Sequence, residues 1–237
     1  MDFSKAFSYI KEDIRWQQKF VIGALINLSV FFFGVRSAVT AYTQNSLPMA
    51  LLSMLLFLAP GMMTLGYSIN IARNVREGIA NPLPEWKFFE HWKLGATVSL
   101  ASFAYILPIS LGFGYMVMKG WIGFGSIGLF ILAFSIFIGL LMATLNINFT
   151  RTDSLRSCFH PKGMRFIMEH RWRELLMLMG FSYVMGSVAS QGFAMGGNFW
   201  FGAIVSSVVG ALSTFMIGHL YGQVASMVDI DKVNHPN

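Results

Sequence analysis

The residues best suited to chemistry in this sequence gather around the run PLPEW, and they are Arg73, Arg76, Pro82, Pro84, Glu85 and Trp86. One interpretation is a cytoplasmic docking surface, in which Trp86 anchors a partner and the two arginines bind its charges. The other is a rigid corner, because each proline fixes its own φ near −65° and restricts the residue before it. In a corner, Glu85 would pair with Arg73 or Arg76, and Trp86 would lie at the level of lipid headgroups. The corner is favoured, since two prolines joining two helices already give the motif a structural role.

A second pair, His170 and Glu174, has a spacing used by metal ligands, because residues four apart share one face of a helix. No third ligand at a fixed spacing is evident, and an interfacial helix with a charged face accounts for the same residues. We therefore predict no metal site and no cofactor. The sequence also lacks a Ser-His-Asp set, a phosphate-binding glycine loop, paired catalytic carboxylates and a cysteine cluster, its one cysteine being Cys158. These features argue against an enzyme.

The composition indicates the class of protein to which these residues belong. Hydrophobic residues make up 55% of the 237 positions and charged residues only 12%, against about 25% charged residues in soluble domains. Apolar runs of roughly 20 residues recur along the whole length, and a helix of that length crosses the hydrocarbon core of a bilayer. We predict an all-α integral membrane protein. The pI near 9.6 could suggest a nucleic-acid partner, but basic residues at membrane boundaries are better explained as orientation signals, so none is expected.

Six transmembrane helices and two interfacial amphipathic helices are expected within a single domain, residues 1–237. The first interfacial helix covers residues 3–19, where Phe3, Phe7, Ile10 and Ile14 form an apolar face. The second covers residues 150–173. The transmembrane helices are expected at about 20–35, 48–72, 94–117, 121–147, 174–193 and 199–228.

Prolines and glycines inside these spans give more specific expectations. Pro60 and Pro108 could mark broken helices around a substrate site. A simple kink is favoured, since membrane helices tolerate proline where neighbours satisfy the freed carbonyl. Gly218 and Gly222 form a pair of small residues four apart, which predicts close packing of the last span against another helix.

Lysines and arginines predict the orientation of the chain. The segments on the side of the two termini hold all 17 of these residues except Arg36 and Lys119. Short cytoplasmic loops carry an excess of lysine and arginine. Both termini are therefore expected in the cytoplasm of a prokaryotic cell, with the protein in the plasma (inner) membrane.

A weak internal repeat is also visible. Phe7, Ile10, Glu12 and Gly23 align at a constant offset with Met164, Ile167, Glu169 and Gly180. Both copies would begin on the cytoplasmic side, so the repeat would be parallel. It divides the chain into a first half at 1–74, a connector with a central helix pair at 75–150, and a second half with the tail at 151–237.

The run GYSINIARNVREGIANPLPEW resembles the signature of an uncharacterised prokaryotic family of multi-pass membrane proteins, domain-of-unknown-function family 4013. The opening MDFSKAFSYIKEDIRWQQKFVIGALINL and the later run FMIGHLYGQVA are similar to the start and end of that family. Acidic residues usually follow the tryptophan in the family pattern, whereas Lys87, Phe88 and Phe89 follow it here, which argues against cation binding by the motif. The resemblance implies an architecture and no activity.

The expected function is non-enzymatic, as a membrane scaffold or accessory subunit whose partners are the lipid bilayer and other membrane or cytoplasmic proteins. The alternative is a carrier or channel for a small neutral or lipid-like molecule. None of the 11 acidic residues lies in the interior of a predicted span, and ion-coupled transporters usually place such groups at membrane depth. A polar cavity at the bilayer midplane would favour transport. A packed bundle with an exposed cytoplasmic aromatic surface would favour a scaffold.

Overall fold

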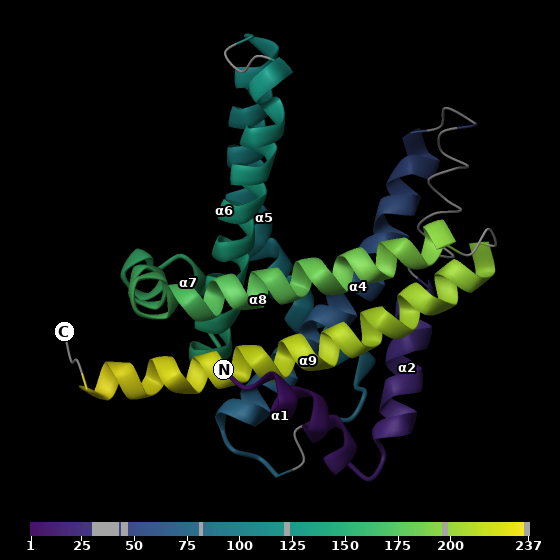
Figure 1. Ribbon diagram of the computed structural model, residues 1–237, viewed down its shortest axis with the longest axis vertical. Coiled ribbons are helices and arrows are strands. Elements are labelled where there is room, and N and C mark those ends of the chain that lie inside the picture. Colours follow the sequence, from purple (N-terminus) through teal and green to yellow (C-terminus); the bar gives the residue numbers. More distant parts are fainter. Residues whose placement is uncertain (30–42, 44–46, 81–82, 121–123, 196–198, 235–237) are drawn as a thin grey trace.

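The computed structural model describes residues 1–29, 43, 47–80, 83–120, 124–195 and 199–234, and every regular element within them is a helix (Figure 1). In chain order the elements are α1 (Phe3–Ser8), the 3-10 helix η1 (Tyr9–Glu12), α2 (Trp16–Ser29), α4 (Leu47–Arg76), α5 (Phe88–Met118), α6 (Phe124–Thr152), α7 (Leu155–Cys158), α8 (Pro161–Met195) and α9 (Phe199–Asn234). The all-α prediction is therefore confirmed for this part of the chain. Pro82 and the last part of the first predicted span, 30–35, lie outside the described residues.

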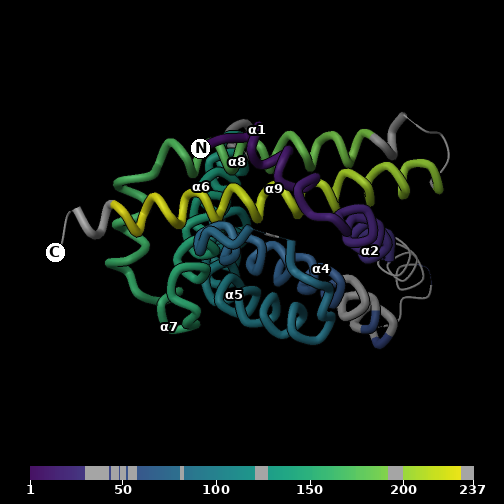
Figure 2. The backbone as a smooth tube through the Cα atoms, turned by 90° about the horizontal axis from the view of Figure 1, so that it is seen from below, coloured from purple at the N-terminus to yellow at the C-terminus, as the bar shows by residue number. Residues whose placement is uncertain are grey.

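Helix α4 joins two pairs of long helices. In Figure 1, α8 and α9 run side by side, and α5 and α6 form a second pair that stands across the first. Figure 2 shows α4 alongside α5, and α4 also packs against α9, so it joins the two pairs. The outer part of the second pair is held by aromatic stacking, with the rings of Phe113 and Phe134 5.3 Å apart.

Glycines set the closest helix contacts. At the α4–α5 crossing, a Cβ added to Gly66 would overlap the backbone of His91, and one added to Gly95 would overlap the backbone of Met62. Gly218 and Gly222 of α9 lie in the same way against Ser68, Ile71, Ala72 and Val75 of α4. The predicted close packing of the Gly218–Gly222 pair is therefore confirmed, because side chains at these positions would push the helices apart.

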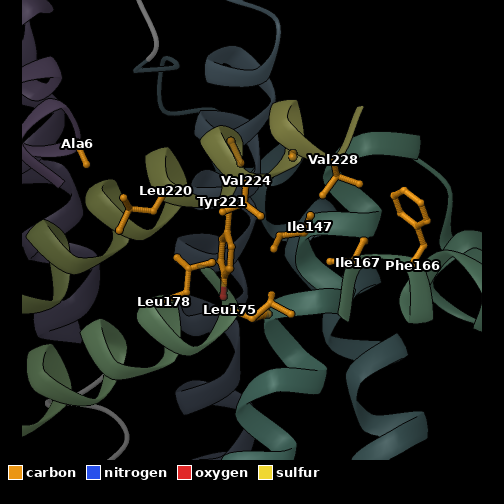
Figure 3. Close-up of a cluster of buried hydrophobic side chains, with 13 residues drawn as sticks. Ala6, Ile147, Phe166, Ile167, Leu175, Leu178, Leu220, Tyr221, Val224 and Val228 are labelled. Carbon is orange, nitrogen blue, oxygen red and sulfur yellow. The ribbon is translucent and has the colours of Figure 1, made fainter. Parts of the chain in front are cut away.

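The main apolar core lies where α6, α8 and α9 meet (Figure 3). Ile147, Leu175 and Leu220 are fully or almost fully buried there, and Ala6 brings α1 against the same cluster. The N-terminus is tied to α9 by two hydrogen bonds, in which Asp2 N donates to Gln223 Oε1 over 2.7 Å and Gln223 Nε2 donates to Asp2 O over 3.0 Å. The first residues thus belong to the folded body.

The prediction of one continuous helix over residues 3–19 is wrong. The chain passes from α1 through η1 into a turn at residues 13–15, and α2 begins only at Trp16. Asp13 makes the break, because its carboxylate accepts the N–H of Arg15 at 2.8 Å and its carbonyl accepts that of Trp16 at 3.1 Å. Of the predicted apolar face, Ile10 is buried against the bundle, whereas Phe7 and Ile14 are exposed.

The second predicted interfacial segment, 150–173, is also divided. α6 continues to Thr152 and ends at Asp153, whose φ of 55° is a left-handed conformation. After the short α7, α8 runs from Pro161 into the fifth predicted span, with its helical geometry broken at Arg171, where φ is −128° and ψ is 26°. This break lies close to the predicted boundary at residue 173.

Three helices in the described part of the chain are long and apolar enough to cross a membrane, namely Phe88–Met118, Gly128–Thr152 and Trp200–Ile230. They coincide with the third, fourth and sixth predicted spans and indicate a membrane location. Pro60 and Pro108 lie inside α4 and α5, and both helices continue through them. Neither proline marks a broken helix.

Candidate functional site

The PLPEW connector is held against the bundle by its last four residues, Leu83 to Trp86, which we call the strap. Leu83 is buried, and the carbonyl of Pro84 accepts a hydrogen bond from the Tyr67 hydroxyl of α4 at 2.9 Å. The ring of Trp86 stacks on Tyr67 with centroids 3.8 Å apart and planes 10° apart. The indole N–H of Trp86 donates to the carbonyl of Lys19 at 2.8 Å. The ring and the N–H of Trp86 therefore both make their contacts within the protein.

A buried lysine joins the strap to the start of α2. Lys19 Nζ lies 2.8 Å from Asp13 Oδ2 and 3.2 Å from Glu85 Oε1, and its side chain is only 7% exposed. It also donates to the carbonyl of Leu83 at 2.7 Å. Arg15 pairs with the same Glu85 oxygen at 2.6 Å from the solvent side. The predicted pairing of Glu85 with Arg73 or Arg76 is wrong, because the turn at residues 13–15 places two closer cations beside Glu85.

Arg73 and Arg76 belong to a different cluster. Arg76 Nε lies 2.7 Å from Asp229 Oδ2, and Arg151 Nη2 lies 2.6 Å from the other oxygen of the same carboxylate. Arg73 Nε lies 2.7 Å from Asp153 Oδ1. The two groups form an ion pair, but the direction of the Nε–H does not make a hydrogen bond. These arginines occupy the last turns of α4 and α6, where a cation is favoured by the negative end of the helix dipole. We call the Arg76–Asp229–Arg151 group the clamp.

His91 links the strap with Arg73 in place of the predicted ion pair. Its Nε2 lies 2.9 Å from the Glu85 carbonyl, and its Nδ1 lies 2.9 Å from Asn70 Nδ2. Because a carbonyl only accepts, this arrangement places the imidazole proton on Nε2. Asn70 Oδ1 in turn accepts from Arg73 at 3.3 Å. Of the six predicted site residues, Glu85 and Trp86 contact α2, Pro84 contacts Tyr67 of α4, and Arg73 and Arg76 lie at the end of α4. The structure does not describe Pro82.

A polar cavity of about 260 Å³ lies between α4, α6 and α9. Six of its eight lining residues have polar, uncharged side chains, namely Thr64, Ser68, Asn146, Ser213, Thr214 and Tyr221. None of the eight carries a carboxylate, an ammonium, a guanidinium or an imidazole. The lining can therefore donate and accept hydrogen bonds without presenting a full charge.

Ser68 is the least satisfied residue of this lining. It is only 5% exposed, and its hydroxyl has no hydrogen-bond partner among the residues that the structure describes. The hydroxyls of Thr64 and Thr214 instead donate to carbonyls of their own helices, each at 2.9 Å. Asn146 Nδ2 reaches the Tyr221 hydroxyl only at 3.4 Å. A buried hydroxyl without a partner costs about 1–3 kcal/mol, and the Ser68 oxygen is itself fully buried, so a guest in the cavity would reach it only after neighbouring side chains move.

The cavity lies deeper along the helices than the clamp. Ser68 precedes Arg76 on α4, and Tyr221 precedes Asp229 on α9, each by about two helical turns, or roughly 12 Å. Ser213 lies about two turns further still from that end of α9. The lining residues on α9 thus fall within its apolar run that is long enough to span a membrane, and Asn146 lies within that of α6.

The strap and most of the cavity fall in a region shared with other proteins. The family model DUF4013, described as a protein of unknown function, matches residues 49–220. The chain belongs to the DUF4013 family. The match includes the strap and every polar cavity residue except Tyr221, whereas Asp13, Arg15 and Lys19 precede it. No curated protein and no solved structure matches the chain.

The sequence interpretation missed the cavity, although a signal was present. Ser68, Asn146 and Ser213 are uncharged polar residues inside or at the edge of predicted spans. A search for charged residues within the spans does not find them. It also missed Lys19, which stands at the end of a segment expected to lie on the membrane surface. Its role depends on a turn that no periodicity indicates.

Proposed function

We propose that this DUF4013 protein is a six-span carrier or channel that binds a small neutral polar molecule in the cavity between α4, α6 and α9. Both termini would lie in the cytoplasm of a prokaryotic cell, with the protein in the inner membrane. The three long apolar helices support the membrane location, and the one-sided distribution of lysine and arginine supports the orientation of the termini. A non-catalytic role is part of the proposal.

The observation that carries the proposal is the cavity itself, in which six of the eight lining residues have polar, uncharged side chains. Polar groups at membrane depth are expensive, and their usual location is a bundle interior or a water-filled pathway. The absence of charge in the lining favours a neutral solute over an ion. The volume of about 260 Å³ is smaller than the roughly 300–1,000 Å³ of pockets that bury drug-sized ligands, which favours a small solute.

The proposal is tested by solute flux into proteoliposomes, followed by stopped-flow light scattering with glycerol and urea as neutral probes. Ser68→Ala and Asn146→Leu should lower the flux, since each removes hydrogen-bonding groups from the lining. The matched control is Ser207→Ala, because Ser207 is a buried serine of α9 outside the lining whose hydroxyl donates to Ala203 O at 2.6 Å. Flux equal to that of protein-free liposomes, or equal in all variants, would contradict the proposal.

The topology has its own test. Reporter fusions at residues 44, 119 and 196 should read as external, and fusions at 80, 160 and 237 as cytoplasmic. A reproducible reading on the wrong side at any of these positions removes a span from the proposed arrangement.

A parallel repeat is also part of the proposal. The offset that aligns Phe7 with Met164 aligns Ile14 with Arg171. The turn after η1 includes Ile14, and the helical break inside α8 is at Arg171. Equivalent breaks at equivalent positions support two related halves, each made of a short segment followed by two helices.

A scaffold or accessory subunit is the second candidate. Phe88, Phe89 and Trp92 form an exposed aromatic group at the start of α5, with Phe89 74% exposed and stacked on Trp92. Such a group favours contact with another protein or with headgroups. Phe89→Ser should release co-purifying proteins if the scaffold role holds, with solute flux unchanged. An unchanged set of co-purifying proteins would leave that role without support.

A further inference from the structure

A groove on the outer face of the α4–α5 pair has the form of a lipid site. It encloses about 430 Å³ and is lined by Met62 of α4 and, on α5, by Trp92, Lys93, Ala96, Thr97, Leu100 and Phe103. Its residues on α5 follow the pattern i, i+1, i+4, i+5, i+8 and i+11, so they form one stripe along the helix. Ala96 lies among larger side chains in this stripe, and its small size leaves the space open.

One end of the groove carries a positive charge. Lys93 lies at the predicted start of the third span, and no ion pair joins its ammonium to any residue that the structure describes. Lys87, one and a half turns earlier, pairs with Glu90 at 3.2 Å. Lys93 therefore differs from its neighbour in having its charge available to a ligand at the membrane boundary.

The length of the groove fits one leaflet. Lys93 and Phe103 are ten positions apart on a helix, which is about 15 Å. This is about half of the roughly 30 Å hydrocarbon core. A cation at the boundary and an apolar channel of one-leaflet depth match the headgroup and acyl chain of a single lipid.

We propose that this groove binds an anionic glycerophospholipid, with its phosphate on Lys93 and one acyl chain against Ala96, Leu100 and Phe103. In the proposed topology the lipid belongs to the cytoplasmic leaflet. Trp92 borders the headgroup, as tryptophan does at membrane interfaces. The site is separate from the α4–α6–α9 cavity, so it does not depend on the transport role.

The test is native mass spectrometry of the full-length protein with dioleoyl-phosphatidylglycerol or dioleoyl-phosphatidylcholine. The wild-type chain should retain the anionic lipid preferentially, and Lys93→Gln should weaken that retention about fivefold, as expected for one cation at a membrane surface. Lys93→Arg should restore it. Lys87→Gln is the matched control and should retain lipid like the wild type.

A second variant distinguishes binding in the groove from nonspecific electrostatic attraction of the lipid. Ala96→Phe keeps Lys93 but fills the channel, so it should lose the lipid as Lys93→Gln does. Thermal melting of each variant establishes that it is folded. Equal losses in Lys93→Gln and Lys87→Gln, or full retention in folded Ala96→Phe, would overturn the proposal.

Discussion

The ammonium of Lys19 lies 3.2 Å from the carboxylate of Glu85, and this contact fixes the strap to the start of α2. Asp13 shares the same ammonium at 2.8 Å from a nearly buried position. The strap is thus attached to the N-terminal segment, which in turn packs against α9. The strap, the N-terminal segment and α9 thus form a junction of three segments distant in sequence.

Replacing Lys19 should be far more damaging than replacing Arg15. Lys19→Met leaves Asp13 buried without a cation, and removal of one partner from a buried pair costs about 3 kcal/mol or more. Arg15→Gln breaks an exposed pair with Glu85, worth about 1 kcal/mol or less. Chemical or thermal unfolding in detergent measures both. Similar losses in the two variants would show that burial of Lys19 does not govern the junction.

The coupling of Glu85 to its neighbours can be measured by double-mutant cycles of the free energy of unfolding. Lys19→Met combined with Glu85→Gln should be non-additive, because the groups are in contact. Arg73→Ala combined with Glu85→Gln should be nearly additive, since Arg73 pairs with Asp153. Strong coupling of Arg73 to Glu85 would restore the pairing first predicted from the sequence.

Trp86 should act as a structural residue. Trp86→Ala removes its stacking on Tyr67 and its hydrogen bond to Lys19 O, and should lower the free energy of unfolding by about 3 kcal/mol. Trp172→Ala is the control, because Trp172 is largely exposed on α8. Unchanged melting of Trp86→Ala with loss of a co-purifying protein would reinstate Trp86 as a docking anchor.

The α4–α5 crossing predicts opposite effects for two glycines of α5. Gly95→Ala places a Cβ in the backbone of Met62 and should destabilise the protein by about 1–3 kcal/mol through overpacking. Gly112→Ala has nothing within 4 Å of the added carbon and should be neutral or stabilising by up to about 1 kcal/mol through helix propensity. Melting of the two variants compares them directly. Equal tolerance would mean that the helices do not meet at Gly95.

Cys158 should not react with thiol reagents in the folded protein. It is completely buried, and burial raises the pKa of its thiol to about 11. Since the thiolate is the reactive form, a thiol-reactive fluorophore at pH 7.5 should label the chain only as it unfolds on heating. Rapid labelling below the melting temperature would contradict this burial.

The same shift predicts a pH dependence of stability. The folded-state pKa of the Cys158 thiol is above the unfolded value of about 9. The contribution of the neutral thiol to the free energy of unfolding is therefore constant below pH 9 and is lost as the pH rises toward 11. The melting temperature should fall more steeply across this range in the wild type than in Cys158→Ala. Parallel curves for the two proteins would exclude this titration.

Long apolar runs were the most predictable part of the fold. The ranges 94–117 and 199–228 lie inside α5 and α9, because a run that must cross a membrane is marked by length and composition alone. The Gly218–Gly222 packing was predictable for a similar reason, since small residues in such a run indicate close helix contact.

The contacts of the candidate site could not be predicted in the same way. Lys19 meets Glu85 only because Asp13 ends the first segment and turns the chain, which is a local competition between side-chain and helical hydrogen bonds. The cavity depends on how three helices cross, and the position of Ser68 in its own helix does not show which neighbour it lacks.

Reactivity of a cysteine at position 68 tests the central claim most directly. In a Cys158→Ala background, Ser68→Cys should react with methyl methanethiosulfonate, a small neutral reagent, because position 68 lines the cavity. Its reaction with a bulky trimethylammonium analogue should be much slower, since the lining offers a small space without a compensating charge. Ser207→Cys, buried in α9 outside the lining, should react with neither while folded. If Ser68→Cys is as inert toward the small reagent as Ser207→Cys, neutral solutes do not reach this cavity and the proposed function is contradicted.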